Sequence, residues 1–178
     1  VAGPHLNVYN PQSLALVAAL GATRWVAPIE VTRDIAQGVL AERPAGVEAE
    51  VFAHGRLPLA FSARCFTARR YNLQKENCAY RCLEHPDGLP LKTREGEPFL
   101  TLNGVQTLSA KVYSLARDIG SLRETGIDIL RVSPQSRGTL DVRQGLRAAC
   151  DGARVQGFAE TDRCDGFWHG RPGLERAA

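Results

Sequence analysis

Short apolar runs alternate with segments of helical periodicity along this chain, and this alternation restricts its fold more than any other feature. Strands interleaved with helices predict a parallel sheet with helices packed outside it. The predicted strands are residues 5–9, 23–27, 47–53, 99–102 and 127–132, and the predicted helices are residues 13–20, 32–43, 109–124 and 139–150. The sequence therefore predicts an α/β fold.

The predicted strands are too few to close a barrel. A closed eight-stranded β/α barrel usually needs roughly 250 residues, whereas this chain has 178. The chain begins at Val1 and contains no Met, so we expect its natural N-terminus to lie upstream. The expected fold is the C-terminal part of a TIM-like parallel β/α barrel whose N-terminal strands are missing, with exposed sheet ends.

The expected barrel domain covers residues 1–150 and includes a long cysteine-bearing loop at residues 54–98. The strand at residues 47–53 is expected to end at His54-Gly55, because Gly relaxes the backbone and ends the ladder. From Asp151 the sequence has Gly and Arg throughout and no periodicity. Residues 151–178 are therefore predicted to be a tail of loop and short turns that packs on the domain.

Three of the five cysteines lie in the predicted loop. Cys65, Cys78 and Cys82 have twelve and three residues between them. Cationic side chains near them would stabilise thiolates; they are Arg64, Arg69, Arg70, Lys75 and Arg81. A chain of this length needs neither disulfides nor metal merely to fold. The spacing therefore suggests a shared metal or cluster, in a reducing compartment.

Soft sulfur ligands select an iron-sulfur cluster or zinc over hard cations. Structural zinc remains an alternative, because zinc tolerates two to four residues between paired cysteines. Three unrelated buried cysteines are the third reading, although a charged, turn-rich loop is a poor place to bury thiols. We expect Cys150 to pack in the core as a small hydrophobe. Cys164 has no assigned role.

Three residues are candidates for catalysis, and they are His54, Glu30 and Glu50. The expected fold places Glu30, His54 and Asn103 at the carboxyl ends of strands, where barrel enzymes have their sites. His54 could act as acid or base, or it could hydrogen-bond the start of the cysteine loop. Glu30 and Glu50 could bind substrate, and the alternative for each is an ion pair with a loop arginine.

Composition excludes some function classes. No stretch approaches the roughly 20 apolar residues that span a bilayer, so we expect a cytoplasmic protein without a membrane span. The net charge of +3 is mild and spread along the chain, which is weak support for nucleic-acid binding. The motifs of serine and zinc peptidases are not evident, which argues against peptidase activity.

Segments covering nearly the whole chain carry a family resemblance, and they are LNVYN, GATRWVAPIEVTRD, EVFAHGRLPLAFSARCFTARR, the C-x3-C at Cys78 and Cys82, LNGVQTLSA, LRVSPQ and GFWHGRPG. On these segments the chain resembles the collagenase-like family once catalogued as peptidases of unknown catalytic type. That family has a partly TIM-like barrel and includes iron-sulfur hydroxylation proteins. Glu30 and Glu50 match acidic positions of the family.

The wider family has a cysteine shortly after its His-Gly, where this chain has Leu57 and Pro58. In this departure the chain resembles one branch of the family, which takes part in oxygen-independent ubiquinone biosynthesis. That branch takes one 4Fe-4S ligand from near its N-terminus. The resemblance implies that Cys65, Cys78 and Cys82 are three cluster ligands and that the fourth lies in the missing segment.

The resemblance further implies a heterodimer with a second family member that hydroxylates ubiquinone precursors, with prephenate as the hydroxyl donor. The alternatives are a collagenase-like peptidase and an iron-sulfur protein that hydroxylates tRNA or rRNA. The RNA alternative has only scattered arginines in its favour, because aromatic residues do not gather in a patch.

Overall fold

The computed structural model describes residues 1–153 and 163–177 and shows a mixed α/β fold. Its strands are β1 (Arg24–Val26), β2 (Glu48–Phe61), β3 (Leu89–Lys92), β4 (Pro98–Asn103), β5 (Gln106–Ser114), β6 (Ile129–Val132) and β7 (Arg163–Cys164). Its α-helices are α1 (Pro11–Ala19), α2 (Arg33–Ala41), α3 (Phe66–Arg70), α4 (Ile119–Thr125) and α5 (Thr139–Cys150). Three short 3-10 turns are η1 (Pro4–Leu6), η2 (Lys75–Asn77) and η3 (Arg81–Glu84). None of the described helices is both long enough and apolar enough to cross a bilayer.

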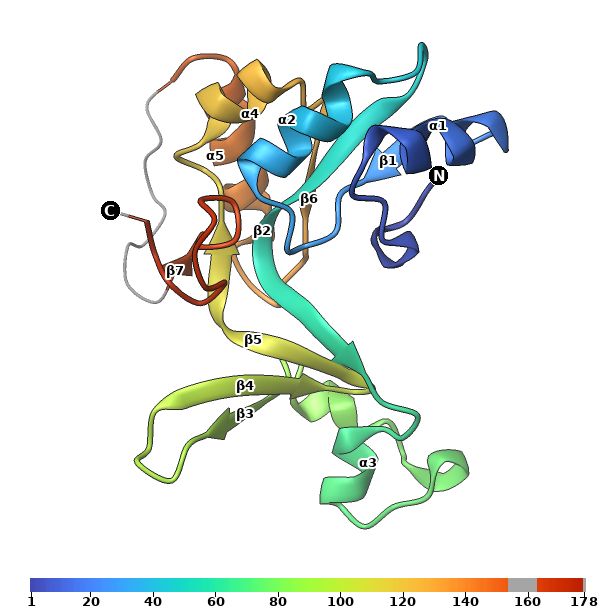
Figure 1. The fold of residues 1–178 in the computed structure, drawn as a ribbon. Coiled ribbons are helices and arrows are strands. Elements are labelled where there is room, and N and C mark those ends of the chain that lie inside the picture. The colour runs from blue at the N-terminus through green and yellow to red at the C-terminus, as the bar shows by residue number, and fades with distance from the viewer. Residues whose placement is uncertain (154–162, 178) are drawn as a thin grey trace.

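The first half of β2 lies in a parallel layer. Glu50 pairs with Val26 of β1 and with Ile129 of β6, both in parallel. Helices α2, α4 and α5 gather beside these strands (Figure 1). Trp25 and Ala49 are fully buried in this core. This part agrees with the predicted alternation of strands and helices.

The second half of β2 belongs to an antiparallel arm. From His54 to Phe61 it pairs with β5, which continues the sheet through β4 to β3. The arm projects away from the helical layer and carries α3 and the cysteine loop near its far end (Figure 1). The described strands form an open sheet. A TIM barrel is therefore not confirmed.

Three local predictions are wrong. β2 does not end at His54-Gly55 but runs to Phe61, so the cysteine loop is residues 62–88 rather than 54–98. Residues 106–114 form strand β5 rather than part of a helix, because the hairpin turn at Gly104-Val105 folds them back onto β4. The predicted strand at residues 5–9 is replaced by η1, and Ala2 bridges Trp25 instead.

The C-terminal tail contributes a short strand. β7 pairs in parallel with β5 through Val112 and Arg163, and a series of turns follows it. The part of the predicted tail at residues 154–162 lies outside the described residues. The described part packs on the domain, because Trp168 is 2% exposed and belongs to the core.

Gly55 lies where β2 passes from the parallel layer into the arm. Its φ of +131° is a conformation that L side chains rarely adopt, and a Cβ there would lie 2.5 Å from Ser133 Cβ. Only glycine therefore lets β2 continue while β6 lies this close.

Replacing Gly55 by Ala should destabilise the fold by about 2 to 4 kcal/mol, because backbone strain and a steric clash add. Gly96→Ala is the matched control, since Gly96 has a φ of +92° but nothing within 4 Å of the added Cβ. Urea unfolding measures both changes. Equal losses in the two variants would show that close contact with β6 does not restrict this position.

Candidate functional site

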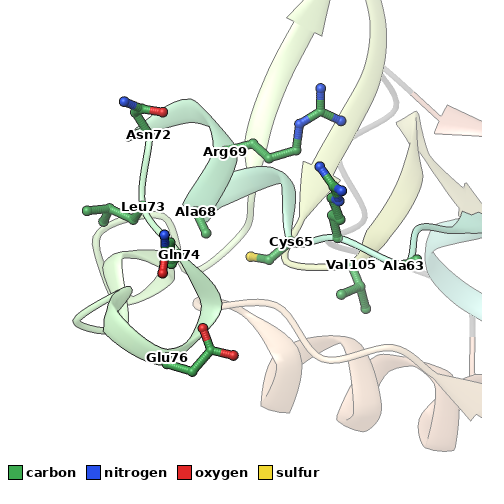
Figure 2. A pocket seen from close by; sticks show the side chains of 10 residues that line it. Ala63, Cys65, Ala68, Arg69, Asn72, Leu73, Gln74, Glu76 and Val105 are labelled. Atoms are coloured by element: carbon green, nitrogen blue, oxygen red, sulfur yellow. The ribbon is translucent and has the colours of Figure 1, made fainter.

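The cysteine loop begins at a cavity of about 590 Å³ at the end of the arm. Cys65 lies at the N-cap of α3 and contributes to the cavity wall. Figure 2 shows the Cys65 sulfur directed toward Ala68 and Gln74. The wall combines apolar, amide and charged groups; it includes Ala63, Leu73, Val105, Asn72, Arg64 and Glu76. Such a cavity can hold a ligand that has both an apolar part and a polar or charged part.

Backbone hydrogen bonds hold the start of this loop against the β4–β5 hairpin. Phe66 N donates to Gly104 O at 2.7 Å, and Ser62 N donates to Val105 O at 2.7 Å. At the other end of the loop, Ser136 N donates to the Asp87 carboxylate at 2.7 Å. This bond and the Ser136 hydroxyl lower the pKa of Asp87. The loop is therefore attached at both ends.

Tyr71 connects the two cysteine-bearing parts of the loop. Its hydroxyl lies 2.8 Å from His85 Nε2, and the two rings stack with centroids 6.0 Å apart. The Arg81 guanidinium lies over the Tyr71 ring, 5.3 Å from its centroid, and also pairs with Glu84. Such cation–π contacts are worth about 0.5 to 1 kcal/mol at exposed sites. Tyr71 thereby fixes η3, which contains Cys82, against the end of α3.

The C-x3-C segment has an uncommon backbone. Ala79 and Tyr80, between Cys78 and Cys82, both have positive φ, at 48° and 50°. Arg81 N donates to Cys78 O at 3.2 Å, so the segment closes into a tight turn. Left-handed conformations of residues other than glycine cost of order 1 kcal/mol or more and concentrate at functional sites.

Cys65, Cys78 and Cys82 are free thiols of intermediate burial. Within the described residues they do not form a group whose sulfur atoms all lie within 4.8 Å of one another. Sulfur atoms around a cubane cluster lie further apart, at roughly 6 to 7 Å, a scale extrapolated from thiolate geometry. Shared ligation by these three residues therefore stays a prediction.

The other two cysteines lie outside the loop. Cys150 ends α5 and is half-buried rather than fully buried in the core as expected. Cys164 lies in β7 and is buried, and burial raises the pKa of its thiol to about 11. A thiol protonated in this way is a poor ligand and nucleophile.

A second cavity, of about 260 Å³, lies at the carboxyl ends of β1 and β6. Two guanidinium-bearing residues, Arg56 and Arg131, contribute to its lining beside Phe52 and Pro134. Arg131 also pairs with Glu50, which is 5% exposed and pairs with Arg24 at 3.2 Å as well. The expected ion pair of Glu50 therefore exists, but with strand arginines rather than with arginines of the cysteine loop.

His54 lies where β2 pairs with β5 and β6 at once. The side chain is 4% exposed, and its Nδ1 lies 3.1 Å from Ser114 Oγ. Burial, and then the charge of Arg163, lower the pKa of His54 to about 4. His54 is therefore neutral at pH 7, and its hydrogen bond with Ser114 reaches β5 rather than the cysteine loop.

The remaining sequence candidates lie apart. Glu30 is exposed in the connection after β1, where its carboxylate adds to the effect of burial in raising the pKa of Tyr9. Asn103 ends β4 in the antiparallel hairpin, so its expected place at the carboxyl end of a parallel strand is wrong. Sequence patterns do not indicate a role for Tyr71 or Arg56, because each acts through partners that lie further along the chain.

The lowered pKa of His54 predicts a pH-dependent stability. Between pH 6.5 and 4 the unfolded chain binds a proton at His54 that the folded chain does not, so folding stability falls as the pH falls. The loss from this group should be on the order of 2 kcal/mol. Urea unfolding at several pH values should show this component disappear in His54→Asn and persist in His5→Asn, a change at an exposed histidine. An unaltered pH dependence in His54→Asn would contradict the assignment.

Comparison with known proteins identifies a family for the chain but finds no solved structure similar to it. The sequence profile described as peptidase family U32 matches residues 2–163, which include both cavities and all three loop cysteines. Because that match covers most of the chain, the chain belongs to the collagenase-like peptidase family U32.

Proposed function

We propose that this protein is a UbiV-like iron-sulfur protein that takes part in oxygen-independent hydroxylation of ubiquinone precursors. The observation that supports this best is the cysteine loop, in which three free, half-exposed thiols lie on one segment fastened by Tyr71. A buried structural role would not leave all three thiols accessible.

The donor set fits a 4Fe-4S cluster. Cys65, Cys78 and Cys82 would supply three thiolates, and a fourth ligand would come from outside the loop. Arg64 and Arg69 line the same cavity as Cys65 and would offset the negative charge of the thiolates. When bound, such a cluster supplies electron transfer or a Lewis-acidic iron.

The second cavity fits the hydroxyl donor implied by the family. Prephenate carries two carboxylates, and planar guanidinium groups bind carboxylates with two parallel hydrogen bonds. Arg56 and Arg131 line a cavity whose walls also include Phe52 and Leu108, which suit an apolar ring. In this proposal the arginines orient prephenate, while Glu50 holds Arg131 in place.

The surface near Cys82 supports a protein partner. Tyr80 is 73% exposed and Leu83 is 80% exposed, and these residues lie on either side of Arg81 and Cys82. Large apolar side chains exposed together at a site are typical of interaction surfaces. A UbiU-like protein, forming a heterodimer, is the partner we propose for this surface.

Peptidase activity, suggested by the family name, has one geometric feature in its favour. His54 and Ser114 have the arrangement of a base and a nucleophile, 3.1 Å apart. Both residues are buried, however, and the low pKa of His54 makes its imidazole a weak base. A peptide carbonyl would not reach this pair. Hydroxylation of RNA is the other alternative, and salt-dependent retention on RNA would distinguish it.

Cluster binding is tested on full-length protein purified without oxygen. It should be brown and hold about four iron atoms per chain. Cys78→Ala and Cys82→Ala should each lose most of that iron, because removing a thiolate exposes an iron corner to solvent. Cys150→Ala is the matched control and should keep the iron, at a cost in stability of about 1 kcal/mol. Iron and zinc are measured by elemental analysis.

Two results would count against the proposal. If the full-length protein bound zinc and no iron after anaerobic reconstitution, both the cluster and the hydroxylation role would be wrong. If Cys78→Ala and Cys150→Ala lost equal amounts of iron, the ligands would not be those of the cysteine loop.

A further inference from the structure

Three potential metal ligands lie close together near the C-terminal end of β5, outside the cysteine loop. Asp118 precedes α4, and Asp165 and His169 lie in the turns after β7. Their ligand atoms all lie within 4.8 Å of one another, and His169 Nε2 is 3.2 Å from Asp118 Oδ1. Metal–ligand distances near 2.1 Å separate ligand atoms by about 3 to 3.5 Å, so only small side-chain rotations would close the site.

Asp118 does not use its carboxylate as its position would suggest. An aspartate at an N-cap usually accepts a hydrogen bond from the first turn of its helix, but the Asp118 side chain makes no such bond. It pairs with His169 instead, and only 12% of the side chain is exposed. Burial, and also the charge of Asp165, raise the pKa of Asp118, while His169 and Arg117 lower it. Two carboxylates held this close favour a nearby cation.

The turns that present Asp165 and His169 are tightly built. Trp168 N donates to Asp165 O and His169 N donates to Gly166 O, each at 3.1 Å. A Cβ on Gly166 would lie 2.0 Å from Pro172 O, so only glycine fits there. The indole of Trp168 is buried and its Nε1 donates to Ser121 Oγ of α4 at 3.3 Å. This bond fixes the His169 turn against the helix that Asp118 precedes.

The C-terminal segment holds the Asp165 carboxylate. Its Oδ1 accepts a hydrogen bond from Ala177 N at 2.6 Å, which orients the carboxylate. A ligand carboxylate oriented by a hydrogen bond is usual around protein metals. The two carboxylates balance the charge of a divalent cation, and the His169 imidazole offers a third ligand atom.

We propose that Asp118, Asp165 and His169 form a divalent-cation site, separate from the cysteine loop. One imidazole and two carboxylates suit zinc or manganese, and three protein ligands leave a coordination position open. The site contains none of the cysteines, so it does not depend on the proposed cluster.

Mn²⁺ is the probe, because it prefers oxygen and imidazole ligands and binds thiolates poorly. Mn²⁺ bound by the full-length protein is counted from the loss of the free-ion EPR signal during titration. A single site is expected in the wild type, and Asp165→Asn and His169→Gln should each weaken it at least about tenfold. Asp141→Asn and His5→Gln change exposed residues elsewhere and should bind Mn²⁺ as the wild type does. Circular dichroism shows whether each variant is folded.

Cys78→Ser separates this proposal from the proposed function, since it should keep Mn²⁺ binding even where it loses iron. The cation site is overturned if folded wild-type protein binds no Mn²⁺. It is also overturned if Asp165→Asn and His169→Gln bind Mn²⁺ as tightly as the wild type. Loss of iron binding alone would overturn only the cluster proposal.

Discussion

Strand β2 belongs both to the parallel part and to the antiparallel part of the one sheet, and the rest of the structure depends on how it passes from one to the other. Its first residues pair in parallel with β1 and β6, and its last residues pair antiparallel with β5. Backbone groups left unpaired at such a transition would be costly when buried. Ser133 N avoids this by donating to His54 O at 2.8 Å, and Leu115 N donates to Ala53 O at 2.9 Å. The transition therefore keeps its hydrogen bonds while it turns the arm away from the helical layer.

The arm determines where the cysteine loop and its cavity lie. Because β2 continues past His54, the cysteine loop starts at Ser62, beyond the parallel layer, instead of at the strand ends of a barrel. The arginine-lined cavity lies at the carboxyl ends of β1 and β6, and its lining extends to the arm through Pro58 and Gln106. The second cavity is thus lined by the middle of β2, and the cavity at Cys65 begins just after the C-terminal end of the same strand. If the proposed reaction uses both cavities, strand β2 connects the proposed substrate cavity to the loop that would hold the cluster.

Local signals were sufficient where short-range contacts decide the structure. Helical periodicity predicts the helix at residues 32–43, and α2 forms at Arg33–Ala41, where Thr32 Oγ1 accepts from Ile35 N as an N-cap should. β5 was not predicted, because Leu108, Val112 and Leu115 have the spacing of a helix and only pairing with β2 and β4 makes them a strand. The spacing of the cysteines likewise indicates the loop that carries them. Tyr71 and Asp118, in contrast, act through contacts with His85 and His169, and sequence spacing does not reveal these contacts.

Anomalous scattering at the iron edge, from crystals of the full-length protein grown without oxygen, tests the central claim most directly. The account predicts strong anomalous density bonded to the sulfur atoms of Cys65, Cys78 and Cys82, beside the ring of Tyr71. Density at these sulfurs only at the zinc edge, or thiols that remain apart with no metal between them in well-ordered loops, would contradict it.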